Sequence, residues 1–286
     1  MLAALNGTMK TTLAAGLSLC AALAFPLSGA EVVYSKDGKG IPGYKDTPLQ
    51  PWSGYLTHDP DRPTPPKVEP GETGTANKPG SAPSDAVVLF NGKDLSQWQP
   101  APAWKVEGEL LVAGNGLLST KQEFGDCQLH LEWQAPNPPV GKLWDQGNNG
   151  VLMMGLAEIQ IFDSYTNKLY ADGQAAAVYA QTPPLVNATR RAGEWQTYDI
   201  VWLAPAFENG KLVKPARVTM FHNGLLVHHN QEVYGNTPHR GLAKYPNDKT
   251  KGPLSLMGHN NPVRFRNIWI RPLAPRQDRK PAQPAN

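Results

Sequence analysis

Residues 217–228 read RVTMFHNGLLVH, and this stretch indicates the fold class of the chain. Two short, largely apolar runs flank Asn223-Gly224. Both central positions of a two-residue type I′ turn need a positive φ, which Asn and Gly adopt most readily. The stretch therefore predicts a tight β-hairpin.

Similar short apolar runs recur from Ala86 onward, separated by Gly, Asn, Asp and Pro, a pattern typical of strands and turns. In QLHLEW, residues 128–133, alternation places Leu129, Leu131 and Trp133 on one face and polar residues on the other. No helix of convincing length competes with these runs. The pattern predicts an all-β sandwich or jelly roll, whose two sheets pack through apolar faces and leave a polar outer face for a groove.

The first 30 residues have the pattern of an export signal. Met9-Lys10 is followed by an apolar run over 11–27 and by the small residues Ser28-Gly29-Ala30. A membrane anchor is the alternative, but threonines, serines, a glycine and a proline interrupt the run, and Leu19 disfavours lipidation of Cys20. We expect cleavage after Ala30, a periplasmic or secreted protein, and no membrane span.

Residues 31–86 contain ten of the 28 prolines and several Gly-rich pieces. Such a segment forms neither a continuous ladder nor a helix. Because it also carries aromatic residues, we expect a proline-rich arm that partly docks on the domain, the alternative being an unstructured spacer. The jelly-roll domain is then expected over 87–273, followed by a flexible tail over 274–286.

The charged residues and cysteines exclude several classes of function. The 27 basic and 24 acidic residues are scattered along the chain, without the basic cluster that nucleic-acid binding requires, so no nucleic-acid partner is expected. Once residues 1–30 are removed, only Cys127 remains, which leaves no internal disulfide and no cysteine-based zinc site. Cys127 lies in an apolar alternating run and is expected to be buried.

The candidates for chemistry are single residues, because no nucleophile elbow, phosphate loop, dinucleotide fingerprint or zinc-binding His-Glu-x-x-His motif is present. Glu158 and Gln160 share one face of a predicted strand, and Asp163 follows where that strand ends. His259 follows Gly258 at a bend, where an imidazole could serve as acid or base. Glu132, taken alone, is typical of a solvated strand carboxylate.

Several motifs of the domain are specific only in combination. They are LFNGKDL at 89–95 with Trp98, GNNGV at 147–151, EIQIFDS at 158–164, GEWQTYDI at 193–200, ARVT at 216–219, HNG at 222–224 and PVRFRNIWI at 262–270. Together they resemble the 3-keto-disaccharide hydrolase domain family over about residues 87–273. The resemblance implies a concanavalin A-like jelly roll that binds carbohydrate and cleaves glycosides already oxidised at carbon 3.

The resemblance also implies site residues. A ketone at carbon 3 acidifies the carbon 2 proton, so such a site needs a base, a partner for the enolate oxygen and an acid for the leaving group. By position, Glu158 matches the family's strand carboxylate, and Asn149, Gln160, Asp163 and His259 match its other polar positions. Our hypothesis makes Glu158 the base, gives His259 the acid or enolate-polarising role, groups Asp163 with the catalytic residues, and assigns sugar hydroxyls to Glu132, Asn149 and Gln160.

Some alternatives stay open at this stage. Met257-Gly258 stands where the family commonly has Gln and Asp, which removes two polar groups. A divalent cation held by Glu158, Asp163 and His259 could act as Lewis acid, although their spacing does not require a metal. A non-catalytic carbohydrate-binding jelly roll, or a structural protein whose arm engages a partner through Trp52 and Tyr55, would share the fold. The sequence carries no indication of the oligomeric state.

Overall fold

The structure, a computed structural model, describes residues 31–167 and 169–274. The predicted signal peptide and residues 275–286 of the predicted tail lie outside the described residues. The described chain divides into two compact units, residues 31–65 and residues 66–274. The predicted arm, residues 31–86, is therefore shared between the two units.

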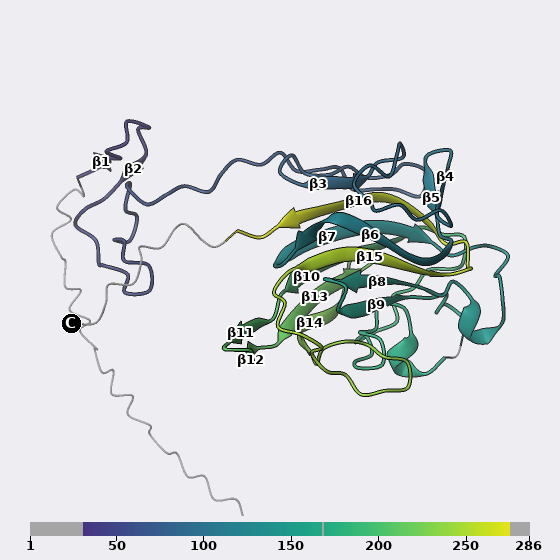
Figure 1. The fold of residues 1–286 in the computed structure, drawn as a ribbon. Coiled ribbons are helices and arrows are strands. Elements are labelled where there is room, and N and C mark those ends of the chain that lie inside the picture. The colour runs from purple at the N-terminus through teal and green to yellow at the C-terminus, as the bar shows by residue number, and fades with distance from the viewer. Residues whose placement is uncertain (1–30, 168, 275–286) are drawn as a thin grey trace, which may run out of the picture. The chain divides into compact units, whose positions relative to one another are not determined.

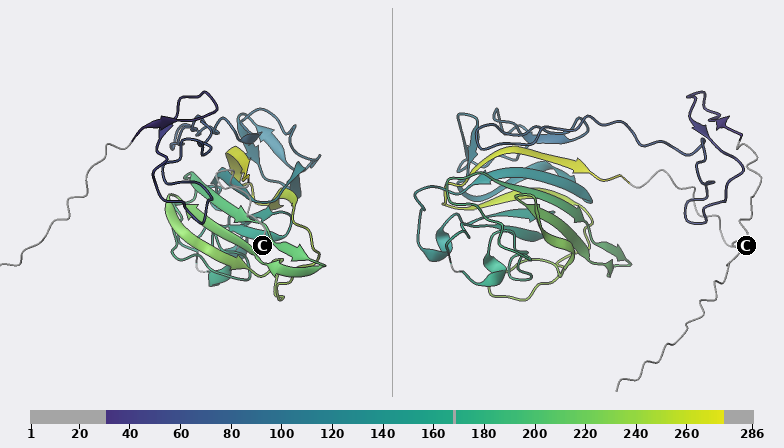
Figure 2. Two further views of the ribbon diagram at one scale, coloured as in Figure 1. Left: turned by 90° about the vertical axis from the view of Figure 1, so that its left-hand side faces the viewer. Right: turned by 180° about the vertical axis from the view of Figure 1, so that it is seen from behind.

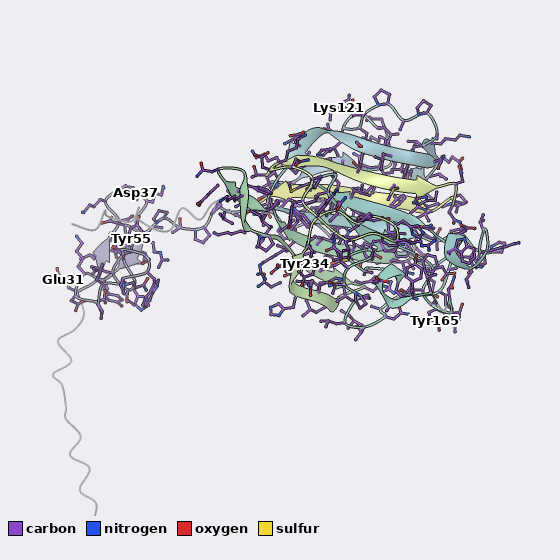
Figure 3. All side chains as sticks on the ribbon, turned by 60° about the horizontal axis from the view of Figure 1, so that its bottom comes forward. Glu31, Asp37, Tyr55, Lys121, Tyr165 and Tyr234 are labelled. Atoms are coloured by element: carbon purple, nitrogen blue, oxygen red, sulfur yellow. The ribbon has the colours of Figure 1, made fainter. Side chains whose placement is uncertain are left out.

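The first unit is small and held mainly by turns. Strands β1 (Val33–Tyr34) and β2 (Pro42–Gly43) form an antiparallel pair, and Leu49 bridges Leu56 further along. The Arg62 guanidinium lies 5.9 Å from the centre of the Tyr55 ring, which is labelled in Figure 3. Trp52 remains 68% exposed, so this unit has little apolar core of its own.

The second unit contains a larger sheet of eight strands, in the order β14-β13-β10-β7-β16-β5-β4, with β3 also paired to β16 (Figure 1). All its pairings are antiparallel. The strands are β3 (Val87–Phe90), β4 (Lys105–Glu107), β5 (Leu110–Val112), β7 (Cys127–Gln134), β10 (Gln196–Leu203), β13 (Ala216–His222), β14 (Leu225–Val233) and β16 (Arg264–Pro272).

The smaller sheet has four antiparallel strands in the order β6-β15-β8-β9. A short hairpin of two further strands, β11 and β12, stands apart from both sheets (Figures 1 and 2). The bounds are β6 (Asn115–Phe124), β8 (Asn149–Met153), β9 (Ala157–Ile161), β11 (Ala206–Glu208), β12 (Lys211–Lys214) and β15 (Gly252–His259). In the described residues, helix is confined to two three-residue 3₁₀ turns, η1 (Leu143–Asp145) and η2 (Ala171–Gly173).

The two sheets share one hydrophobic core, to which β7 contributes Leu129, Leu131 and Trp133, all fully buried. From the smaller sheet, Val151 and Ile159 enter the same core. The alternation predicted for residues 128–133 is thus confirmed, and so is the all-β jelly-roll fold. Free Cys127 is buried at the start of β7, as expected.

The predicted hairpin is present. Strand β13 ends at His222 and β14 begins at Leu225, and these two residues face each other across the turn. Asn223 and Gly224 have φ values of 52° and 80°, as a type I′ turn requires. In the part of the chain that the structure describes, no helix combines the length and apolar character needed to cross a membrane.

Residues 69–85, which we call the strap, lie on the outer face of the larger sheet. Within the strap, the backbone N–H of Ser81 donates to the Glu72 carbonyl, and that of Thr75 donates to the Lys78 carbonyl. A Cβ atom at Gly74 would lie 2.4 Å from Oε1 of Glu132, so only glycine permits this approach to the sheet. This half of the predicted arm is therefore docked on the domain.

Candidate active site

A cavity of about 660 Å³ opens on the outer face of the smaller sheet, and we call it the Glu158 pocket. Its floor comes from the sheet: Glu158 and Gln160 on β9, Met257 and His259 on β15, and Asn148 just before β8. Its walls come from loops, which contribute Trp144, Leu169, Tyr170, Tyr179, Thr237, His239 and Arg240.

Strand alternation places the acid on this face. Ile159 and Ile161 of β9 are fully buried in the core, so Glu158 and Gln160 point to the opposite side of the sheet. The register brings Gly150 of β8 opposite Gln160 and beside Met257 of β15. A Cβ atom at position 150 would lie 2.1 Å from Oε1 of Glu158. Glycine at this position therefore leaves the space that the carboxyl group occupies.

The carboxyl group of Glu158 is buried without compensation. Glu158 is 5% exposed, and no described residue donates a hydrogen bond to its carboxyl group or forms an ion pair with it. Burial raises the pKa of Glu158 to about 8. A carboxylate with such a pKa is a much stronger base than an ordinary glutamate, and it can still ionise close to neutral pH.

Gln160 and His259 complete the floor beside Glu158. The Oε1 atom of Gln160 is buried and has no hydrogen-bond partner among the described residues. Since a buried unpaired polar atom is costly, a donor on a ligand, such as a sugar hydroxyl, would satisfy it. His259 ends β15, and partial burial lowers its pKa, so its imidazole is neutral at neutral pH.

Met257 and Gly258 point to opposite sides of β15. Met257 lines the pocket with an apolar side chain. Gly258 faces the other way, and a Cβ atom there would lie 2.1 Å from the Gly114 carbonyl oxygen. No side chain therefore fits at position 258. The apolar side chain of Met257 lowers the polarity of the pocket that Glu158 and His259 line.

One wall of the pocket is built by residues 174–182, which pair with the open edge of β9. The Gln160 N–H donates to the Ala177 carbonyl, and the Tyr179 N–H donates to the Glu158 carbonyl at 3.0 Å. The Tyr179 hydroxyl lies 2.9 Å from Nδ1 of His239 and 3.1 Å from the Tyr170 hydroxyl. Sequence reasoning missed these three residues, because loop positions carry no periodic signal.

The structure does not bring Glu132, which was predicted to bind sugar hydroxyls, to this pocket. Glu132 lies on β7 of the larger sheet, beneath the strap. It pairs with Nε of Arg266 at 2.6 Å and accepts hydrogen bonds from the Gly80 N–H and the Asn267 amide. Its carboxylate is therefore fully engaged in holding the strap and the sheet together, and it is 1% exposed.

Two further predicted residues, Asn149 and Asp163, do not line the pocket. Asn149 points to the core side of β8 and donates to the Asn261 carbonyl at 3.2 Å, while the preceding Asn148 lines the pocket. The prediction was thus one residue out, which on a strand means the opposite face. Asp163 is 6% exposed and does not line the pocket, and burial raises its pKa.

The candidate metal ligands can also be compared with the structure. In residues 31–167 and 169–274, no group of three or more His, Cys, Asp or Glu side chains is placed to hold a metal ion. Glu158 and His259 line the same pocket, but Asp163 does not join them.

Comparison with known proteins gives the family of this chain. The family model described as the 3-keto-alpha-glucoside-1,2-lyase-like domain matches residues 85–271. The chain belongs to this family. No curated protein matches it.

Two solved structures are similar to this chain. A protein of Parabacteroides distasonis, described as a candidate glycosyl hydrolase, is 37% identical, with a TM-score of 0.71 over 77% of this chain and 99% of its own. A second candidate glycosyl hydrolase of the same organism is 21% identical, with a TM-score of 0.52 over 66% of this chain and 99% of its own, and shows the shared fold alone.

Proposed function

We propose that this protein cleaves 3-keto-glycosides by base-initiated β-elimination followed by addition of water, with net hydrolysis. The observation that carries the proposal is the uncompensated carboxyl group of Glu158, buried in a pocket with Gln160 and His259. The family match supports the same reaction class.

In the proposed reaction, the carboxylate of Glu158 removes the proton from carbon 2 of the oxidised sugar. The electrons of that C–H bond form an enolate with the carbon 3 ketone. The imidazole N–H of His259 donates a hydrogen bond to the enolate oxygen, which stabilises the developing charge. Collapse of the enolate forms the carbon 1–carbon 2 double bond and expels the glycosidic oxygen.

The remaining groups of the floor position the sugar. The unpaired Oε1 atom of Gln160 would accept a hydrogen bond from a sugar hydroxyl, and Asn148 lies on the same face. A buried acceptor of this kind favours a ligand that brings a donor and disfavours one that does not. Water then adds to carbon 1 of the enone and gives the free 3-keto sugar.

The test uses the mature protein and a 3-keto-glucoside with a chromogenic leaving group, with and without chelator, beside the Glu158→Ala and His259→Ala variants. The proposal predicts release by the wild type and none by the Glu158 variant, with a strong reduction for the His259 variant. Sensitivity to the chelator would assign a role to a divalent cation. Sugar binding without release above background would contradict the enzyme and favour a carbohydrate-binding protein.

The proposal includes export, with action in the periplasm or outside the cell. It rests on the charged, apolar and small-residue pattern of residues 1–30. Amino-terminal sequencing of the protein from an expressing bacterium is expected to begin at Glu31. An intact amino terminus in the cytoplasmic fraction would contradict it.

A further inference from the structure

The proposed elimination expels the glycosidic oxygen, and an alkoxide or sugar oxygen leaves far more easily when a proton reaches it as the bond breaks. Glu158 holds the carbon 2 proton when the enolate collapses, but the later addition of water needs that proton back at carbon 2. In the proposed reaction, His259 is engaged with the enolate oxygen at carbon 3. A separate proton donor is therefore needed within the Glu158 pocket.

We infer that Tyr179 is this donor and that Tyr170 and His239 hold its oxygen in place. Tyr179 lines the pocket together with Glu158, and its backbone N–H is bonded to the Glu158 carbonyl. The inference rests on the proposed function and adds to it the group that protonates the leaving oxygen.

The hydrogen-bond geometry around Tyr179 supports this role. Its hydroxyl oxygen has two partners, Nδ1 of His239 at 2.9 Å and the Tyr170 hydroxyl at 3.1 Å. When both partners donate, the oxygen accepts two hydrogen bonds, and the proton of Tyr179 itself is free to point into the pocket. The same two donors would stabilise the phenolate that remains after transfer.

The local fold builds this arrangement from two loops. Tyr170 lies at the start of η2, and a Cβ atom at Gly173 would lie 2.2 Å from the Tyr170 ring. Glycine at 173 therefore lets this ring lie against the turn and reach Tyr179. Arg240, next to His239, has a φ of 56°, a conformation that is uncommon for a side chain of this size and is often found at functional sites.

The protonation state of Tyr179 suits a general acid for a poor leaving group. Burial raises the pKa of Tyr179 above its ordinary value, and the nearby charge of Glu158 adds to this rise. The phenol therefore holds its proton at neutral pH, when an acid must be protonated to act. His239 is exposed, so the phenolate can regain its proton from solvent through this imidazole.

The step balances in protons and electrons. The carbon 2 proton goes to Glu158, and its bond electrons become the carbon 1–carbon 2 double bond. The electrons of the bond between carbon 1 and oxygen leave with the oxygen, which takes the proton of Tyr179. The products are an enone and an alcohol, and Tyr179 is reprotonated by His239 and solvent.

The experiment compares leaving groups. Wild type, Tyr179→Phe and the control Tyr234→Phe are assayed on 3-keto-glucosides of 4-nitrophenol, which leaves readily without a proton, and of methanol, which does not. Tyr234 is 54% exposed, lies outside the pocket just after β14, and is labelled in Figure 3. We expect Tyr179→Phe to reduce kcat/KM about 100-fold or more for the methyl glycoside and less than about threefold for the nitrophenyl glycoside.

If Tyr179 had only a structural role, Tyr179→Phe would reduce kcat/KM equally for both substrates. An equal reduction, or none, overturns the inference and leaves the proposed function intact. Release from neither substrate by the wild type overturns both. Tyr170→Phe removes one of the two donors and is expected to show the same discrimination between leaving groups, but a smaller loss. Tyr234→Phe is expected to match the wild type on both substrates.

Discussion

Two glutamates on the outer faces of the two sheets have nearly the same burial and opposite electrostatics. Glu132 on the larger sheet is 1% exposed and Glu158 on the smaller sheet is 5% exposed. Burial alone would raise the pKa of both. At Glu132, His130 at 3.9 Å and hydrogen bonds from Gly80, Asn267 and Arg266 outweigh burial and lower the pKa to about 2.

At Glu158, nothing offsets burial, and the pKa rises to about 8. The strap covers the outer face of the larger sheet at Glu132, where the side chains of Arg266 and Glu132 are 8% and 1% exposed. The outer face of the smaller sheet opens into the Glu158 pocket. Burial of a carboxylate therefore does not by itself indicate the role of that carboxylate. Glu132 stabilises the fold, whereas the uncompensated burial of Glu158 costs stability and, under the proposed function, supplies the base.

The largest expected effect separates the two glutamates by activity. Glu158→Gln should reduce turnover of a 3-keto-glycoside by about 10²–10⁴-fold, because it removes the base. Glu132→Gln should leave the turnover of the folded protein within about threefold of the wild type, because Glu132 does not line the pocket. Steady-state kinetics of both variants test this. Equal losses would show that the two faces are not separate in function.

The next effect is on stability at the sealed face. Arg266→Met leaves the carboxylate of Glu132 without its ion-pair partner and should lower the free energy of unfolding by about 3–5 kcal/mol. The matched control is Arg271→Met, because Arg271 pairs with Asp85 of the strap at an exposed position. That variant should lose less than about 1 kcal/mol. Urea denaturation of both variants checks the contrast, and similar losses would contradict it.

The pH dependence of stability should also differ between the two faces. The folded-state pKa of Glu158 is raised from 4.5 to about 8, so its contribution is most favourable below pH 4.5 and is lost as the pH rises to 8. The lost stability is on the order of 4 kcal/mol. Glu158→Gln should therefore be more stable than the wild type at pH 8 and lose this advantage towards pH 4.5. A constant difference across that range would contradict the raised pKa.

Glu132 should show the opposite slope. Its folded-state pKa is lowered from 4.5 to about 2, so the stability that it contributes is present above pH 4.5 and is lost as the pH falls towards 2. Glu132→Gln should therefore lower the free energy of unfolding more at pH 7 than at pH 3. Thermal unfolding of Glu132→Gln at the two pH values measures the change.

The smallest expected effect concerns the space for the Glu158 carboxyl group. In Gly150→Ala, the added methyl group would displace this carboxyl, and kcat/KM should fall about tenfold as the base moves from its position. The melting temperature should change little, because position 150 faces the pocket and not the core. An unchanged kcat/KM would show that the position of the carboxyl over Gly150 is not needed for catalysis.

The fold could be predicted from local patterns, since the turn at 223–224 and the alternation at 128–133 each specify their own geometry. The same alternation brought Glu158 and Gln160 to one face. Alternation does not show that Glu132 and Glu158 lie in different sheets, because the pairing of strands is set by contacts between residues distant in sequence. Asn148 and Asn149 are adjacent in the sequence but point to opposite faces, and the prediction named the one that does not line the pocket.

The walls of the pocket could not be predicted in the same way. Tyr170, Tyr179 and His239 lie in loops, where neither the period of a strand nor that of a helix constrains the side chain. These side chains converge because residues 174–182 pair with the edge of β9. No local sequence pattern predicts this pairing. The strap likewise depends on Gly74 lying against Glu132, a contact between distant parts of the chain.

Loss of an isotopic label from carbon 2 tests whether Glu158 removes the proton from that carbon. A 3-keto-glucoside deuterated at carbon 2 is incubated with wild type, Glu132→Gln and Glu158→Gln, and its isotopic content and release are followed by NMR. With wild type and Glu132→Gln, we expect a primary isotope effect on release and loss of deuterium to water. With Glu158→Gln, we expect neither. Release with deuterium retained at carbon 2, or loss of deuterium that persists in Glu158→Gln, would contradict this role of Glu158.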